Sequence, residues 1–142
     1  MMRRVLPLLI ALALAWTLTA PAPAQAQSSV RVVLAYYSAQ TEPVFQAIKE
    51  AFEAQHPEIT VHLEVIAWDN LFQALTTRLA GGQEPDLAII GTRWLPGFVQ
   101  QGVAQPLDEF ITEEFRSQFA PALFEPSTID GKVYGLPVAA SA

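Results

Sequence analysis

The fold is decided by the stretch Val30-Arg-Val-Val-Leu-Ala-Tyr-Tyr37. Seven of its eight residues are apolar or aromatic and three are valine, a composition typical of a strand covered on both faces within a parallel sheet. The polar loop Ser38-Ala-Gln-Thr-Glu42 follows, and Pro43 then opens a helix. In open α/β sheets, a loop between a buried strand and the next helix is the usual place for a ligand. We therefore interpret this stretch as the first strand and loop of a binding lobe.

Two further strands are predicted from their apolar patterns. Ile59 to Ile66 alternates apolar and polar residues, which indicates a strand at or near a sheet edge. Pro85 to Ile90 contains a short continuous apolar run and indicates an interior strand. With a helix after each strand, the pattern predicts an α/β fold, a three-layer sandwich around a mainly parallel sheet in the order 2-1-3.

Helical periodicity and capping residues predict a helix after each of these strands. The three helices are expected to run from Glu42 or Pro43 to Gln55, from the N-cap Asp69 to Gly81-Gly82, and from the N-cap Thr92 to about Gln101. The apolar faces expected to point inward carry Val44, Ile48 and Phe52 in the first helix and Leu71, Phe72, Leu75 and Leu79 in the second.

The last third of the chain is expected to hold shorter elements. Pro106 to Ile111 and Glu113 to Phe119 are interpreted as two short helices that bury their phenylalanines, and Ile129 to Val138 as two short strands. Asp130-Gly131 is a strong hairpin signal between those strands.

Residues 1–26 have the pattern of a secretory signal peptide. Arg3-Arg4 form a positive start, Val5 to Leu18 form an apolar run, and Ala24-Gln-Ala26 offers the small residues of a cleavage site. Cleavage after Ala24 is a close competitor. The alternative of an uncleaved membrane anchor is less favoured, because the run of 14 residues is shorter than the ~20 needed to span a bilayer.

Charge and cysteine content restrict the class of protein. Of 8 basic residues, the two arginines of the signal are lost on cleavage, so six remain against 14 acidic residues and the mature net charge is −8. Such a chain is a poor candidate for binding nucleic acid. There is no cysteine, which excludes disulfides and the lipidated cysteine of a lipoprotein. We expect a soluble periplasmic protein.

No catalytic motif is present in the sequence. The nucleophile elbow, the glycine-rich phosphate loops and the paired histidines of zinc proteases are all absent. His56 precedes a proline and His62 lies on the wetter face of a strand, so both are interpreted as non-catalytic. Glu113 and Glu114 suit the first turn of a helix. We expect no enzyme activity, no cofactor and no metal.

The loops at residues 36–42, 66–70 and 91–94 are expected to meet at the carboxyl edge of the sheet. Aromatic rings that stack on a sugar, beside polar groups that bond its hydroxyls, would suit a neutral polyhydroxylated ligand. The predicted ligand-binding residues are Tyr37, Ser38, Gln40, Glu42, Trp68, Thr92, Arg93 and Trp94. Tyr36, Thr41 and Asp69 lie in the same loops.

Structural roles remain open for several residues of these loops. Tyr36 could belong to the core, and Asp69 and Thr92 could act only as helix caps. Trp68 and Trp94 could pack between helix and sheet. Arg93 could pair with Glu42 or Asp69.

Four motifs in succession resemble the family 1 extracellular solute-binding proteins, the substrate-capturing components of ABC importers, mostly for sugars. Together they cover nearly all of residues 30–138. The motifs are Glu53-Ala-Gln-His-Pro57 with Ile59-Thr-Val61, Leu79-Ala-Gly-Gly82 with Pro85-Asp-Leu87, Gly102-Val-Ala-Gln-Pro-Leu-Asp108, and Gly131-Lys-Val-Tyr-Gly-Leu-Pro137.

The resemblance implies a type II periplasmic-binding fold, in which two α/β lobes close on a ligand. It places ligand contacts on Tyr37 to Glu42, on Trp68 and on Thr92 to Trp94. Family members are more than twice as long, so residues 27–142 are expected to be the first lobe of a longer protein. The implied partners are a small solute, such as a carbohydrate, and the transmembrane subunits of an ABC permease. We expect a monomer, and poor solubility of the isolated mature chain.

Two other functions remain open at this stage. The same fold could bind a polyamine, an oligopeptide or an anion, the last favoured by Arg93 near helix N-termini. A secreted α/β hydrolase is the third reading, and it would need catalytic residues outside this sequence.

Overall fold

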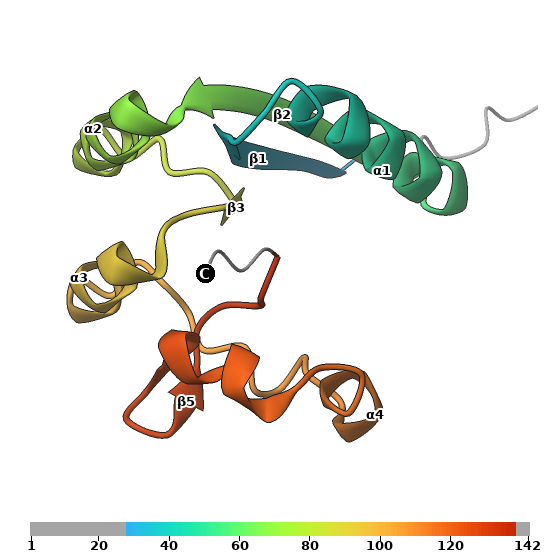
Figure 1. Ribbon diagram of the computed structural model, residues 1–142. Coiled ribbons are helices and arrows are strands. Elements are labelled where there is room, and N and C mark those ends of the chain that lie inside the picture. The colour runs from blue at the N-terminus through green and yellow to red at the C-terminus, as the bar shows by residue number, and fades with distance from the viewer. Residues whose placement is uncertain (1–27, 139–142) are drawn as a thin grey trace, which may run out of the picture.

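The computed structural model describes residues 28–138 (Figure 1). The predicted signal peptide lies outside the described residues and stays a prediction. The α-helices and strands are β1 (Ser28–Tyr36), α1 (Thr41–Gln55), β2 (Ile59–Ala67), α2 (Trp68–Ala80), β3 (Leu87–Ala88), α3 (Leu95–Gln100), α4 (Glu113–Arg116), β4 (Thr128–Ile129) and β5 (Lys132–Val133). Short 3-10 helices span Thr92–Trp94, Pro121–Leu123 and Glu125–Ser127.

The main sheet is parallel and has the predicted order β2-β1-β3. β1 pairs with β2 along its whole length, from Ser28 opposite Ile59 to Tyr36 opposite Ala67. Val33, Leu34 and Ala35 of β1 are almost completely buried. The expectation that the opening stretch forms the central strand is therefore confirmed.

Helices lie on both faces of this sheet, as the α/β prediction required. The crossover from β1 to β2 and the crossover from β2 back past β1 to β3 run in opposite directions across the sheet, so right-handed connections place α1 and α2 on opposite faces. Figure 1 shows α1 along β1 and β2, with α2 and α3 grouped beyond the carboxyl end of β2. The core is formed by Val33 and Ala35 with Leu71 and Leu75 of α2 and Phe98 of α3.

The prediction of an interior third strand is wrong for the described part of the chain. β3 comprises only two residues and pairs with β1 alone, so it lies at an edge and Leu87 is 60% exposed. Two additional bonds extend the contact, from the Asp86 N–H to the Arg31 carbonyl and from the Ile89 N–H to the Val33 carbonyl. The apolar run indicated a strand that can be buried, but among residues 28–138 no strand covers its outer edge.

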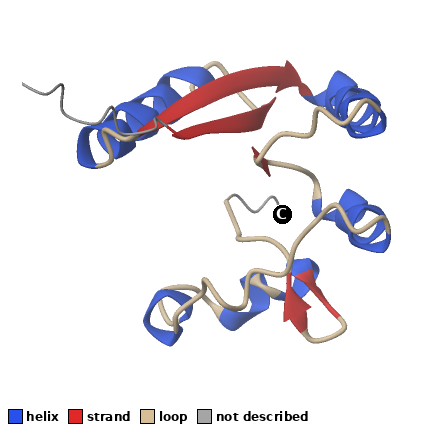
Figure 2. Cartoon of the chain, turned by 180° about the vertical axis from the view of Figure 1, so that it is seen from behind, coloured by secondary structure: helices blue, strands red, loops and turns tan. Residues whose placement is uncertain are grey.

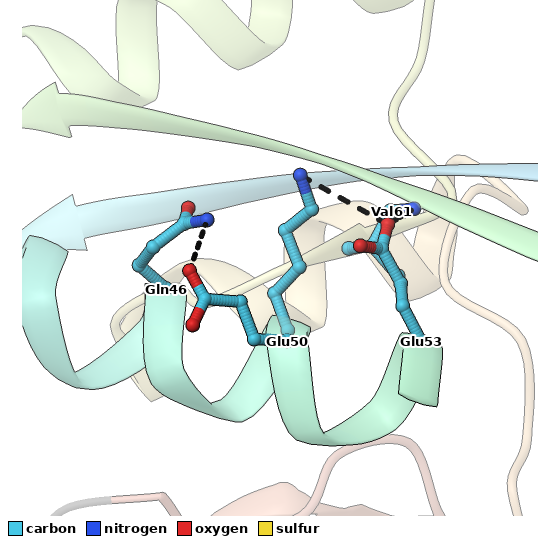
Figure 3. Close-up of polar contacts among 5 residues, drawn as sticks. Gln46, Glu50, Glu53 and Val61 are labelled. Carbon is cyan, nitrogen blue, oxygen red and sulfur yellow. Dashed lines mark hydrogen bonds and ion pairs between the residues drawn. The ribbon is translucent and has the colours of Figure 1, made fainter. Parts of the chain in front are cut away.

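The apolar face of α1 is also more exposed than predicted, with Val44 at 50% and Ile48 at 55%. The helix instead brings a carboxylate to the edge of β2, where Oε1 of Glu53 accepts the Val61 N–H at 2.7 Å (Figure 3). In β2 the Val61 N–H faces away from β1, so Glu53 satisfies a donor that an edge strand would leave to water.

The predicted caps of α2 and α3 are wrong in detail. α2 begins at Trp68 with Ala67 as N-cap, so Asp69 lies inside the first turn and forms no cap bond. Thr92 begins a 3-10 turn, and the N-cap of α3 is Trp94. The C-terminal expectation is confirmed, because Gly82 has the left-handed φ of 64° that a helix stop favours.

The segment 106–111 forms a turn and no helix, contrary to prediction. Asp108 accepts the Val133 N–H of β5, and the Leu107 N–H is bonded to the Val133 carbonyl. These bonds to a distant hairpin fix the segment in a non-helical form and leave Phe110 79% exposed. The hairpin itself is confirmed, with positive φ at Asp130 and Gly131 between β4 and β5 (Figure 2).

α4 is shorter than predicted and ends at Arg116. Thr112 caps it by accepting the Phe115 N–H at 3.1 Å, and Glu113 and Glu114 lie in its first turn as expected. Phe119 lies beyond the helix and packs edge-on against the buried Phe124.

Candidate functional site

The predicted loops follow the carboxyl ends of the three parallel strands. Because Tyr36 pairs with Ala67 across β1 and β2, the residues that follow, Tyr37 and Trp68, come together. Their ring centroids are 5.7 Å apart in a tilted arrangement. The parallel register thus creates an aromatic pair at the edge of the sheet.

The first loop is held by a buried hydroxyl. Oγ1 of Thr41 accepts the N–H groups of Tyr37 at 3.0 Å and Ser38 at 3.1 Å, and Thr41 is only 5% exposed. Within the loop, Oγ of Ser38 accepts the Gln40 N–H at 3.2 Å. The backbone of this loop is therefore ordered by the first residue of α1.

Aromatic rings continue from the site into the core. Trp68 stacks on Trp94 with centroids 5.3 Å apart and an interplanar angle of 27°. Trp94 in turn contacts Phe72 at 5.2 Å, and Phe72 contacts Phe98 at 6.1 Å. We call Tyr37, Trp68, Trp94, Phe72 and Phe98 the aromatic ladder. Its inner end is the buried Phe98, so the rings at the site rest on the core.

Arg93 is associated with this ladder. Its guanidinium carbon lies 5.3 Å from the centroid of the Trp94 ring, which is a cation–π distance. In the described part of the chain, it forms this contact rather than an ion pair with Glu42 or Asp69. The positive charge thus faces the indole in the middle of the ladder.

Partial burial raises the pKa of the Tyr37 phenol above its usual value of 10.0. The cause is desolvation, which disfavours the phenolate. At neutral pH the group is an uncharged O–H that can both donate and accept a hydrogen bond.

The structure brings together four of the predicted residues, namely Tyr37, Trp68, Arg93 and Trp94. The other four are exposed beside them: Ser38 and Gln40 in the first loop, Glu42 in the first turn of α1, and Thr92 at the start of the 3-10 turn. Tyr36 is half exposed rather than part of the core. Trp94 has neighbours on several sides and acts as support for Trp68.

Three residues with a role at the site were not in the predicted set, and one of them is Thr41, which holds the first loop. Phe72 matched the core pattern of α2, yet it packs on Trp94. Gly91 lies directly against the Trp68 ring, and no sequence signal indicates this contact.

Other features of the described residues lie away from these loops. A hollow of about 730 Å³ lies beside the first half of β1 and the middle of β2, and its lining includes Arg31, His62, Glu64 and Arg78. Arg31 pairs there with Asp86, and Arg78 with Glu64. Residues 28–138 contain no group of three potential metal ligands. No helix in this range has the length and apolar character needed to cross a membrane.

Comparison with known proteins gives consistent matches. Residues 38–142 match the family described as bacterial extracellular solute-binding protein. The chain is 54% identical over 113 residues to a protein of Brucella abortus (strain 2308) named "Putative binding protein", a match that covers 80% of this chain and 28% of that protein. It is 35% identical over 97 residues to the maltotriose-binding protein of Pyrococcus abyssi, covering 68% of this chain and 21% of the relative.

A solved structure agrees with these sequence matches. The sugar-binding protein MalE of Xanthomonas citri superposes with a TM-score of 0.69 at 25% identity, over 78% of this chain and 28% of that one. The fold is thus that of the periplasmic binding proteins. The chain spans about 28% of the length of the Brucella relative.

Proposed function

The chain belongs to the family of bacterial extracellular solute-binding proteins, and from this premise we propose that it captures a sugar or oligosaccharide for an ABC importer. The observation that carries the proposal is the aromatic pair Tyr37–Trp68 at the carboxyl edge of the sheet, supported from behind by Trp94. Aromatic rings offer an apolar surface to the C–H face of a sugar, and a neutral phenol beside them can bond a hydroxyl.

The proposed division of roles follows the geometry. Tyr37 and Trp68 form the stacking surface. The exposed polar groups beside them bond sugar hydroxyls, and these groups belong to Ser38, Gln40, Glu42, Thr92 and Arg93. Trp94 supports the surface through its stack with Trp68.

The charges at this edge of the sheet are mixed, which suits a neutral ligand. Arg93 is the cation of the third loop and faces Trp94, so an anion would have to compete with that contact. The relative from Pyrococcus abyssi supports a neutral sugar as ligand, because that protein is named for binding maltotriose.

A polyamine is the second candidate ligand. Glu42 and Asp69 are both exposed near the loops, and neither forms an ion pair within residues 28–138. Two free carboxylates beside aromatic rings would suit an extended cation.

The proposal includes export and delivery. We infer that residues 1–26 direct the chain to the periplasm and are removed, and that residues 27–142 form part of the first lobe of a two-lobed receptor. The liganded receptor, a monomer, would then dock on the transmembrane subunits of a permease. The outward location is supported by the family, which is extracellular.

Calorimetric titration of the intact protein tests the ligand class. The panel contains maltotriose, a mannotriose, spermidine and a tripeptide. We expect binding of at least one sugar, weakened by Trp68→Ala about tenfold, because an aromatic stacking contact is worth up to about 1.5 kcal/mol. The control Phe110→Ala removes a highly exposed ring far along the chain and should leave affinity unchanged.

Two results would overturn the proposal of a sugar site. One is unchanged sugar affinity in Trp68→Ala, and the other is a response to spermidine or the peptide alone.

The hydrolase alternative is less consistent with the residues present. The chain has no cysteine and two histidines. His56 lies next to Glu58 at the end of α1, and His62 is exposed on β2. Hydrolysis of p-nitrophenyl acetate by the intact protein above the buffer rate would revive this alternative.

A further inference from the structure

Gly91 lies between β3 and the 3-10 turn of Thr92–Trp94, directly against the indole of Trp68. We propose that Gly91 is a positioning residue, whose missing side chain creates the space in which Trp68 stacks on Trp94. The predicted effect on ligand affinity rests on the proposed function, whereas the effect on the Trp68 ring does not.

The contact leaves too little room for a methyl group unless a neighbour shifts by a few tenths of an ångström. A Cβ atom at residue 91 would lie 3.3 Å from Cζ2 and 3.4 Å from Cη2 of Trp68. Carbon atoms in optimal contact are separated by about 3.5–4.0 Å. An alanine here therefore requires one of the two partners to move.

Trp68 is the partner that must move. The methyl group would be fixed to the backbone, and the Gly91 carbonyl is bonded to the Trp94 N–H at 3.0 Å. Trp94 is held by Phe72 and Arg93, so it does not follow the displaced ring freely. The stack of Trp68 on Trp94 should loosen, and the tilted pair with Tyr37 should change with it.

The backbone at Gly91 gives this inference a clean test. Its φ is −72° and its ψ is 131°, a conformation that alanine adopts without strain. Gly82, Gly102 and Gly131 have positive φ, so substitution there would add backbone strain. At residue 91 the tightest contacts of an alanine methyl group are with Trp68, and its contact with Cγ of Arg93, at 3.9 Å, is an ordinary one.

Gly97 supplies the matched control. It lies in α3, and a Cβ there would meet nothing within 4 Å. Gly97→Ala adds the same methyl group close by in the chain and should leave the ladder intact.

The experiment compares Gly91→Ala and Gly97→Ala in the intact protein by near-ultraviolet circular dichroism and by sugar titration. The tryptophan bands should change in Gly91→Ala alone. Affinity for the sugar that the wild type binds should fall about three- to tenfold in Gly91→Ala, the range of one aromatic contact.

A second background separates the contact from a general loss of structure. Phenylalanine lacks the ring atoms Cζ2 and Cη2, so Trp68→Phe removes the clash. Adding Gly91→Ala to Trp68→Phe should then cause no further loss of affinity, a non-additivity expected of residues in contact and not of distant, independent ones.

The inference is overturned if Gly91→Ala leaves the dichroism of the wild type unchanged, or if Gly97→Ala causes the same change. It is also overturned if Gly91→Ala reduces affinity equally in the Trp68→Phe background. If the wild type binds no sugar, the proposed function fails, and the dichroism of the two alanine variants alone then decides whether Gly91 positions Trp68.

Discussion

The most informative single change is Thr41→Val, which removes one hydroxyl and keeps the size of the side chain. This hydroxyl accepts the N–H groups of Tyr37 and Ser38 at 3.0 and 3.1 Å. A hydrogen bond of this kind contributes about 0.5–1.5 kcal/mol. Because Thr41 is 5% exposed, water replaces it poorly, and we expect the free energy of unfolding to fall by about 1–3 kcal/mol.

Thr41→Ser is the matched control, since it keeps the acceptor and loses one methyl group. Its cost in stability should be about 0.8 kcal/mol, the value of a buried methylene. Stability alone therefore does not separate the two variants well. The decisive difference is the order of the loop, which only the valine variant should lose.

Amide hydrogen exchange measures this order directly. The amides of Tyr37 and Ser38 should exchange faster in Thr41→Val and at the wild-type rate in Thr41→Ser, because local opening is governed by the bond each amide makes. Urea unfolding supplies the accompanying change in stability. Unchanged exchange at both amides in Thr41→Val, or equal acceleration in both variants, would refute the role given to this hydroxyl.

Three further predictions concern other parts of the chain. The pKa of the Tyr37 phenol is raised above 10.0 in the folded protein, so the unfolded chain loses this proton first as the pH rises. The contribution of Tyr37 to the free energy of unfolding should therefore be constant below pH 10 and should decrease above it. Absorbance titration at 295 nm of the wild type and Tyr37→Phe checks this, and a Tyr37 transition below pH 10 would contradict it. Glu53→Ala leaves the Val61 N–H without its acceptor, and urea unfolding should show that the free energy of unfolding falls by about 1–2 kcal/mol. An unchanged free energy of unfolding would mean that water accepts this hydrogen bond equally well. Phe110 is exposed, so Phe110→Ser should change the free energy of unfolding by less than about 0.5 kcal/mol. Phe124 is only 3% exposed, so Phe124→Ala should lower it by about 3–5 kcal/mol. A similar loss in both variants would contradict this difference in burial.

The order of the sheet could be predicted from the sequence because the strands differ in pattern. β2 alternates apolar and polar residues, and its burial follows that alternation from Val61 to Val65. β1 is apolar from Val30 to Tyr36 except for Arg31, and it is central. Such patterns depend on each strand's own residues, so they can be read without the rest of the fold.

Burial could not be predicted as well as strand order. Apolar patterns show which surface can be buried, but not what covers it. Examples are the helix face with Val44 and Ile48 in α1 and the run that contains Leu87 in β3. Similarly, 106–111 has a helical pattern, yet bonds between Asp108 and Val133 determine its shape. These residues are 25 positions apart, so local pattern contains no information about the contact.

The site shows the same limit at the level of atoms. Convergence of the loops follows from parallel pairing, so Tyr37 and Trp68 could be placed together in advance. Three contacts depend on side-chain geometry: the two N–H groups accepted by Thr41, the stack of Trp68 on Trp94, and the contact of Gly91 with Trp68. None of these has a distinctive residue pattern in a single sequence.

The supports of the aromatic pair have a consequence for the proposed recognition. Thr41 orders the backbone of Tyr37, while Gly91 and Trp94 fix the ring of Trp68. A surface that is rigid before binding loses little entropy when a ligand arrives.

The polar side chains differ, because Gln40 and Thr92 are exposed beside the rings and can adopt several rotamers. A rigid stacking surface with adjustable hydroxyl partners should select for the flat apolar face of a sugar more strongly than for the configuration of each hydroxyl. Sugars that differ at one hydroxyl should then differ less in affinity than a sugar and an acyclic polyol of equal size.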